Sequence, residues 1–250
     1  MALRALIFDV DGTLADTERD GHRVAFNAAF AEAGLSWCWN EVLYGELLKV
    51  AGGIERLLHY ARAFDAASRS EAELQHLVTR LHASKTRHYV KYISAGAVPL
   101  RPGVARLISE ARRGGLRLAI ATTTTRANVI ALLQANLGAQ ASDTFEVIGT
   151  AQEVALKKPD PAVYRWVLKE LRVRAQDALA LEDSRNGLLA ATRAGLACIV
   201  TPTAYSAADD FAEARVRLTD FEHHPKAPQQ PVTLADLRRW HSPQAQGAVP

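Results

Sequence analysis

The sequence is poor in cysteine and methionine and lacks any long apolar run. Its 250 residues include two cysteines, Cys38 and Cys198, which are far apart and do not have the spacing of metal ligands. We therefore expect two reduced thiols that pack as small hydrophobic side chains. No apolar segment approaches the ~20 residues of a membrane span, and Met1 to Ala5 run into a charged motif without a secretory signal. These absences predict a cytoplasmic protein with no membrane partner.

The sequence also lacks a strong excess of charge of one sign. Its 30 basic and 27 acidic residues give a formal net charge of +3, and the basic residues are spread along the chain and interrupted by acidic ones. A nucleic-acid-binding protein would concentrate basic residues, so we expect no nucleic-acid partner. A local cluster of positive groups is enough to bind a small anionic substrate. The 48% of hydrophobic residues suffices for one large domain, or for a core with a smaller appended domain.

Short apolar runs alternate with helical patterns over most of the chain. The strand-length runs are Leu3 to Val10, Leu116 to Ala121, Phe145 to Ile148, Ala178 to Leu181 and Cys198 to Val200. The helical patterns between the later runs are Val104 to Arg113, Ala127 to Leu137, Pro161 to Leu171 and Gly187 to Ala194. Strands that are apolar on both faces and alternate with helices predict an α/β fold with a doubly wound parallel sheet.

The pattern changes to purely helical spacing between the first two strands. No strand-like run occurs there, and Leu74, Leu77, Val78 and Leu81 follow helical periodicity. We predict a helical cap domain over residues 16–94, inserted into a catalytic core of residues 1–15 and 95–250. Trp37 and Trp39 are expected to pack inside this cap. Beyond Pro202 the sequence predicts an irregular segment, with a frayed end from Ser242 to Pro250.

Polar motifs follow four of the predicted strands. They are Asp9-Val10-Asp11-Gly12-Thr13, Thr122-Thr123-Thr124-Thr125, Lys157-Lys158-Pro159 and Glu182-Asp183-Ser184. Parallel strands place their carboxyl ends on one edge of the sheet, where ligands bind in open α/β folds. We therefore expect these motifs to meet in one crevice. Each motif alone is weak, because an Asp or Thr after a strand usually belongs to a turn or a helix cap.

Together, the four motifs in this order resemble the haloacid dehalogenase superfamily, in its phosphatase and mutase branch. The segments Asp11 to Glu18, Gly52 to Arg56, Ala121 to Thr125 and Leu181 to Ser184 are similar to CbbY-like proteins. That group is associated with the Calvin cycle and related to β-phosphoglucomutases. The resemblance implies a Rossmann-like core, a helical cap, and hydrolysis of a small sugar phosphate with Mg²⁺.

The first motif supplies the two reacting carboxyl groups in this interpretation. Asp9 is the expected nucleophile, and its attack on phosphorus divides one hydrolysis into two displacements through an aspartyl-phosphate. Asp11 is the expected general acid and base, which protonates the leaving oxygen and later takes a proton from water. For Mg²⁺, which prefers oxygen ligands, the resemblance implies Asp9, the backbone carbonyl of Asp11, Asp183 and Glu182.

Phosphate recognition falls to the second and third motifs. The Thr122 hydroxyl and the Thr123 amide are expected to bind phosphate oxygens, with Thr124 as a further substrate contact. Lys158, directly before a proline, matches the family lysine that offsets the repulsion between the nucleophile and an anionic phosphate. Lys157 is expected to be a solvated charge.

The cap residues carry weaker signals. Glu18, His22, Arg56 and Lys85 are predicted substrate contacts, and the two cations could meet a second phosphate or sugar hydroxyls. The alternative for each is an ordinary solvated or packed side chain. At Ile54, CbbY-like proteins often have Lys, so this departure puts the family substrate in question.

The resemblance implies a sugar-phosphate phosphatase, for which xylulose 1,5-bisphosphate is a candidate substrate. We expect the protein to be a monomer. A phosphosugar mutase would use the same core residues and return the phosphoryl group to the sugar. A non-catalytic regulatory module that binds phosphate is the alternative of another class.

Overall fold

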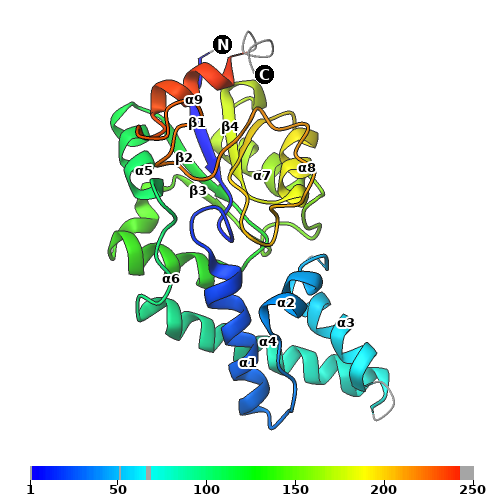
Figure 1. The fold of residues 1–250 in the computed structure, drawn as a ribbon. Coiled ribbons are helices and arrows are strands. Elements are labelled where there is room, and N and C mark those ends of the chain that lie inside the picture. Colours follow the sequence, from blue (N-terminus) through cyan, green and yellow to red (C-terminus); the bar gives the residue numbers. More distant parts are fainter. Residues whose placement is uncertain (1, 51, 66–68, 243–250) are drawn as a thin grey trace.

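The computed structural model describes residues 2–50, 52–65 and 69–242, which form a sheet flanked by helices and a helical region joined to it (Figure 1). Within these residues, six parallel strands lie in the order β3-β2-β1-β4-β5-β6. Their bounds are Ala5–Phe8 (β1), Arg117–Ala121 (β2), Val147–Gly149 (β3), Ala178–Glu182 (β4), Ala197–Val200 (β5) and Val216–Arg217 (β6). Strands are added on both sides of β1, so the sheet is doubly wound, as the sequence predicts.

Side chains alternate across the sheet, and each face has its own helical layer. The core helices are Val104–Arg113 (α5), Arg126–Leu137 (α6), Ala162–Leu171 (α7), Arg185–Arg193 (α8) and Leu234–His241 (α9). Leu6 and Phe8 of β1 pack with α5, α6 and α9, and Ala5 and Ile7 pack with α7 and α8. Burial on both faces explains why the strand sequences are apolar throughout.

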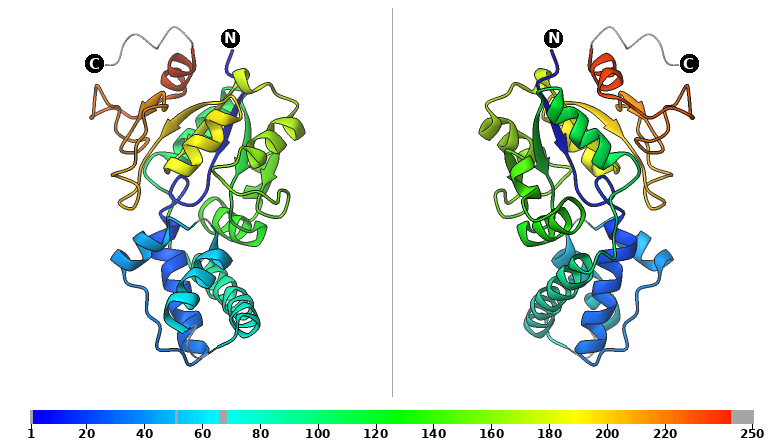
Figure 2. Two further views of the ribbon diagram at one scale, coloured as in Figure 1. Left: turned by 90° about the vertical axis from the view of Figure 1, so that its right-hand side faces the viewer. Right: turned by 90° about the vertical axis from the view of Figure 1, so that its left-hand side faces the viewer.

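Between β1 and β2 the chain forms a helical region below the sheet, which we call the cap (Figures 1 and 2). Its segments are the π-helix Glu18–His22 (η1) and the α-helices Arg23–Glu32 (α1), Glu41–Leu47 (α2), Gly53–Asp65 (α3) and Glu71–Ser94 (α4). Helix α4 packs against α1 and α3 and also contacts α6 of the core. Leu74, Val78 and Leu81 are buried in the cap with Trp39, and Trp37 packs against the same cluster. The predicted packing of the two tryptophans is confirmed.

The two chain segments that join cap and core lie side by side. Ala15 forms a β-bridge with Leu100, and the amide of Arg101 donates to the carbonyl of Leu14 at 2.8 Å. This pairing brings both ends of the insert to the carboxyl edge of the sheet. The cap is therefore held over the end of β1, where Asp9 lies.

Most predicted elements are present, with ends shifted by at most two residues. The prediction of an irregular chain beyond Pro202 is wrong at β6 and α9. Helix α9 begins with a capping box between Thr233 and Asp236, and its Leu234 and Leu237 are buried against α5. Residues 243–250 of the predicted frayed end lie outside the described residues. No helix in the described part of the chain is long and apolar enough to cross a membrane.

Candidate active site

The floor of the site lies where β1, β2 and β4 end. Asp9 follows β1, and Glu182 is the last residue of β4, with Asp183 next. The Lys158 ammonium donates to Asp9 Oδ1 and Glu182 Oε1, both at 2.6 Å, and to the carbonyl of Ala121 at 2.8 Å. The predicted convergence of the first, third and fourth motifs is therefore present in the structure.

These buried groups perturb one another strongly. Burial opposes a charge on Lys158, but Asp9 and Glu182 outweigh that effect and raise the pKa of this lysine. Burial raises the pKa of Asp9 well above its usual value, although the Lys158 charge opposes the shift. The pKa of Asp183 is also raised, by burial and by the charges of Asp9 and Glu182. A bound cation would relieve this repulsion between carboxylates.

Asp9, Glu182 and Asp183 form an acidic cluster that fits a metal ion. One oxygen from each lies within 4.8 Å of the other two. Oε2 of Glu182 is buried and has no hydrogen-bond partner among the described residues. Unused carboxylate oxygens at this spacing are the hard donors that Mg²⁺ prefers. The donor set therefore fits the predicted magnesium site.

Two glycines leave space for this cluster. A Cβ on Gly187 would lie 1.8 Å from Oε2 of Glu182, and a Cβ on Gly12 would lie 2.2 Å from Oδ2 of Asp183. Gly12 also has a φ of +94°, a region that side chains of L-residues rarely adopt. The backbone can approach the carboxylates this closely only because no side chain intervenes.

Asp11 faces the cap and ends a chain of buried polar groups. Its Oδ1 accepts a hydrogen bond from Thr17 Oγ1 at 2.6 Å and lies 3.0 Å from Nε2 of His22. Nδ1 of His22 lies 2.7 Å from Nζ of Lys85 on α4. Burial raises the pKa of Asp11, but His22 and Thr17 outweigh it and lower the value to about 2. Burial lowers the pKa of Lys85 to about 8.

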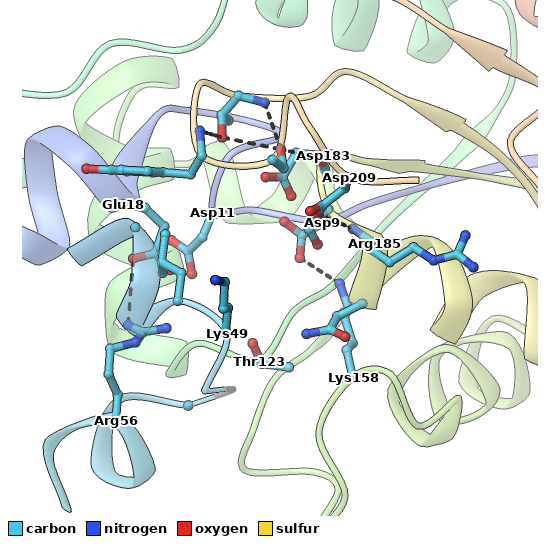
Figure 3. Close-up of a pocket in the computed structure, with 18 residues that line it drawn as sticks. Asp9, Asp11, Glu18, Lys49, Arg56, Thr123, Lys158, Asp183, Arg185 and Asp209 are labelled. Atoms are coloured by element: carbon cyan, nitrogen blue, oxygen red, sulfur yellow. Dashed lines mark hydrogen bonds and ion pairs between the residues drawn. The ribbon is translucent and has the colours of Figure 1, made fainter. Parts of the chain in front are cut away.

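Arg56 forms a second buried network on the cap side. Its Nη1 donates to the Tyr44 hydroxyl and its Nε to the carbonyl of Leu47, both at 3.1 Å. The Tyr44 hydroxyl in turn donates to Oε2 of Glu18 at 2.5 Å. Figure 3 shows Glu18 between Arg56 and Asp11, on the wall of the pocket. Arg56 is therefore positioned to hold Glu18 in place.

The threonines that follow β2 differ in their surroundings. Thr122 is buried, and its Oγ1 accepts a hydrogen bond from the amide of Thr124 at 3.2 Å. Oγ1 of Thr124 accepts from Nδ2 of Asn128 at 2.9 Å. Thr123 lines the pocket beside Asp9 and also the adjoining space under the cap.

Sequence reasoning missed two residues that support the floor. Tyr164 of α7 donates to Oε1 of Glu182 at 2.5 Å. Arg101 donates to the carbonyl oxygens of Gly12 and Thr201, which ties the first motif to the end of β5. Arg101 lies in the segment where the chain returns from the cap to the core, and this position in the sequence could have identified it as a residue near the site. Tyr164 is an ordinary apolar position of its helix in the sequence.

The cavity between floor and cap has two adjoining lobes. The first lobe, of about 380 Å³, is lined by Asp9, Lys158 and Asp183 on the core side and by Lys49 of the cap (Figure 3). The second lobe, of about 310 Å³, lies between the threonine motif and helices α3 and α4. Asp11 borders both lobes, next to the predicted nucleophile. The arrangement suits a ligand with one reacting group and an extended remainder.

Comparison with known proteins agrees with this geometry. A family model described as haloacid dehalogenase-like hydrolase matches residues 3–195. The chain is 52% identical over 247 residues to the plasmid-encoded protein CbbY of Cupriavidus necator, covering 96% of this chain and 97% of the relative. A crystal structure of CbbY from Rhodobacter sphaeroides in complex with phosphate superposes with a TM-score of 0.83 at 44% identity, covering 94% and 99% of the two chains.

A second structure of that Rhodobacter sphaeroides protein, a variant in complex with xylulose-1,5-bisphosphate, has the same TM-score of 0.83 and 43% identity over 94% of this chain and 99% of its own. The family match and these relatives confirm the predicted enzyme class. The similarity also extends over the cap, because the relatives cover nearly the whole chain. The chain belongs to the haloacid dehalogenase-like hydrolase family, within the group that contains the CbbY proteins.

Proposed function

We propose that this enzyme is a Mg²⁺-dependent phosphatase of a small sugar phosphate, and that it acts through an aspartyl-phosphate on Asp9. The observation that carries the proposal is the position of Lys158, 2.6 Å from both Asp9 and Glu182 beside the acidic cluster. The lysine offsets the charge of the nucleophile, and Asp11 stands on the opposite wall of the pocket. This arrangement reduces the repulsion between the Asp9 carboxylate and an anionic phosphate.

In the first displacement, a carboxylate oxygen of Asp9 attacks phosphorus and the sugar oxygen leaves. Asp11 donates a proton to that oxygen. An anionic phosphate beside Asp11 raises the pKa of its carboxyl group, which opposes the effect of His22 and Thr17 and favours the proton-carrying form. Thr122 and Thr123 bind the phosphate oxygens, and Lys158 balances their charge.

In the second displacement, Asp11 takes a proton from water, and the water oxygen attacks phosphorus. The bond to Asp9 breaks, and inorganic phosphate and free Asp9 are produced. Asp9, Asp183, the carbonyl of Asp11 and Glu182 would hold Mg²⁺, which would supply positive charge that offsets the charge of the phosphoryl group. The same side chains thus serve both displacements.

The cap completes this site in the proposal. We assign residues 16–94 to the cap domain and residues 1–15 and 95–250 to the catalytic core. The paired segments at Ala15 and Leu100 provide a compact connection about which the cap can close. A closed cap excludes bulk water and brings Asp11 and Glu18 against the substrate.

The proposed substrate is a pentulose bisphosphate of the kind found in the related crystal structure, xylulose 1,5-bisphosphate. The link to the Calvin cycle rests on the resemblance of the sequence motifs to CbbY-like proteins and is part of this proposal. The phosphatase interpretation is preferred over the mutase because relatives at 29% and 31% identity, which match 85% and 84% of this chain, are phosphoglycolate phosphatases.

The test is phosphate release from a panel of sugar mono- and bisphosphates, with Mg²⁺ and with excess chelator. We expect release from xylulose 1,5-bisphosphate above all other sugars, and loss of release with chelator. Conversion of a sugar phosphate into its positional isomer, dependent on a bisphosphate activator, would identify a mutase. Absence of phosphate release from every substrate, including p-nitrophenyl phosphate, would contradict the proposal.

A further inference from the structure

The second lobe of the cavity raises the question of which cation meets the far end of the substrate. Arg56 and Lys85 are the cap cations predicted from the sequence. Arg56 is 6% exposed, and two of its nitrogen atoms donate to Tyr44 and Leu47. Lys85 is 4% exposed and contacts His22. Both cations line the second lobe, but each already has partners within the protein itself.

Lys157 is a third cation at this lobe, and it comes from the core. The sequence suggests a solvated charge, but its side chain is 27% exposed and its ammonium pairs with Glu55 of α3 at 2.5 Å. A Cβ on Gly52 would lie 2.3 Å from Lys157 Nζ, so the ammonium lies against the backbone at the start of α3. Lys157 therefore extends from the core to the cap at the second lobe.

Two adjacent lysines thus serve opposite ends of the cavity. Lys158 points inward to Asp9, and Lys157 lines the second lobe together with Ile54 and His82. Ile54 is apolar and 40% exposed, so it supplies no charge at this position. The N-terminal turn of α3 borders the same space and adds a favourable field for anions.

His82 reports the electrostatic character of this lobe. Burial lowers the pKa of His82 to about 4, and the charges of Lys85, His22 and Lys157 act in the same direction. Its imidazole is therefore neutral at physiological pH and can donate a hydrogen bond to an oxygen of a ligand. The positive charges that disfavour protonation of His82 favour the binding of an anionic group in the same lobe.

We propose that Lys157 is a specificity-determining residue that binds a phosphate at the far end of the substrate, with Glu55 as its counterion until the substrate arrives. This proposal rests on the proposed phosphatase function. It assigns to a core lysine the recognition that the sequence suggested for Arg56 and Lys85.

The exchange of partners is physically reasonable. The Lys157–Glu55 pair is partly exposed, with 49% of the Glu55 side chain accessible, and such pairs contribute ~0 to 1 kcal/mol in general. A phosphate carries more charge than a carboxylate and accepts more hydrogen bonds. It can therefore displace Glu55 from Lys157 without disturbing the buried networks of Arg56 and Lys85.

The alternative is that Lys157 and Glu55 merely fasten the cap to the core. The two roles separate when each partner is removed in turn. If the pair only links the cap to the core, Lys157→Gln and Glu55→Gln both remove that link, and the two variants change kcat/KM equally for all substrates. A phosphate-binding lysine gives opposite results, because Glu55→Gln removes only the competing carboxylate.

The experiment measures kcat/KM for xylulose 1,5-bisphosphate and for p-nitrophenyl phosphate in the wild type and these variants. Loss of one charged hydrogen bond corresponds to about ten- to hundred-fold. We expect Lys157→Gln to lower the bisphosphate constant by that factor, and at least ten-fold more than the constant for p-nitrophenyl phosphate. Glu55→Gln should not lower kcat/KM for the bisphosphate, and Lys157→Arg should retain most of the wild-type value. Lys49→Gln removes the same charge from the first lobe and should affect both substrates alike.

A binding measurement separates this inference from the phosphatase proposal. In the Asp9→Asn background, which should bind substrate without turnover, Lys157→Gln should weaken calorimetric binding of the bisphosphate by a similar factor. Equal losses in Lys157→Gln and Glu55→Gln, or unchanged bisphosphate binding, would overturn the assignment of Lys157. Phosphate release from p-nitrophenyl phosphate with no bisphosphate binding would overturn it too, and would leave the phosphatase activity standing.

Discussion

The floor of the site and the wall formed by the cap are organised differently. On the floor, Lys158 bridges Asp9 and Glu182, and all three belong to motifs that follow strands. On the cap wall, Arg56 and Lys85 are turned into networks of the protein itself. The chemistry therefore depends on a fixed group of side chains, whereas substrate selection depends on how cap and core segments meet. Substitutions on the floor should act on turnover, and those on the wall should act on selection.

The largest effect is expected for Asp9→Asn, which removes the nucleophilic charge at nearly constant volume. Turnover should fall by about 10⁴-fold or more, because the covalent step is lost. The amide oxygen can still accept from Lys158, so the thermal midpoint without metal should change little. Phosphate release and thermal unfolding of both proteins measure this. Turnover within ten-fold of the wild type would remove Asp9 from the central role.

Asp11→Asn is expected to have the next largest effect. An amide neither donates nor takes the required proton, and general acid-base catalysis contributes about 100- to 10,000-fold. Mg²⁺ affinity, measured by calorimetry, should remain near that of the wild type because the backbone carbonyl of Asp11 is retained. A variant within three-fold of the wild-type rate would show that another group transfers the proton.

Gly187→Ala tests the floor as a metal site. The new methyl group would lie 1.8 Å from Oε2 of Glu182, so the carboxylate must move. Displacing a group of this kind typically lowers metal affinity about 10- to 100-fold. The measurement is a Mg²⁺ titration monitored by calorimetry, together with unfolding in chelator. Unchanged Mg²⁺ affinity would show that Glu182 does not contribute to the metal site.

The floor was more predictable than the wall, for a physical reason. Asp9 and Glu182 occur at the ends of short apolar strands, and parallel strands place their ends together whatever the loop lengths. Cap residues meet the core through helices whose rotation is set by packing. His22 and Lys85, 63 residues apart, were suggested as substrate contacts, but their mutual contact depends on how α4 packs on η1 and α1.

Supporting residues were the least predictable. Tyr164 appears in the sequence as an apolar member of its helix, yet its hydroxyl contacts Glu182. Helix α9 was missed because it is only 8 residues long and follows a segment rich in proline and histidine. The contacts of Lys157 require a segment of the cap to be placed beside a core loop. Local sequence patterns do not contain that information.

The smallest expected effect concerns stability on the cap wall. Burial lowers the pKa of Lys85 from 10.5 to about 8 in the folded protein. Between these pH values the unfolded chain retains a proton that the folded protein has released, so the free energy of unfolding rises with pH, by at most about 1.4 kcal/mol per unit. Lys85→Met keeps the apolar stem and should lack this rise. Denaturant unfolding from about pH 7 to pH 10 compares the two proteins, and parallel profiles would contradict the shift.

The most direct test of the covalent mechanism is a single-turnover experiment with substrate labelled in the phosphoryl group. Rapid quenching in acid preserves an aspartyl-phosphate, and peptide mapping then locates the label. We predict transient label on the peptide that contains Asp9, appearing before inorganic phosphate and absent in Asp9→Asn. Slower loss of the label in Asp11→Asn would place Asp11 in the second displacement. Release of labelled phosphate at the full rate, with no labelled peptide at any time, would contradict covalent catalysis by Asp9.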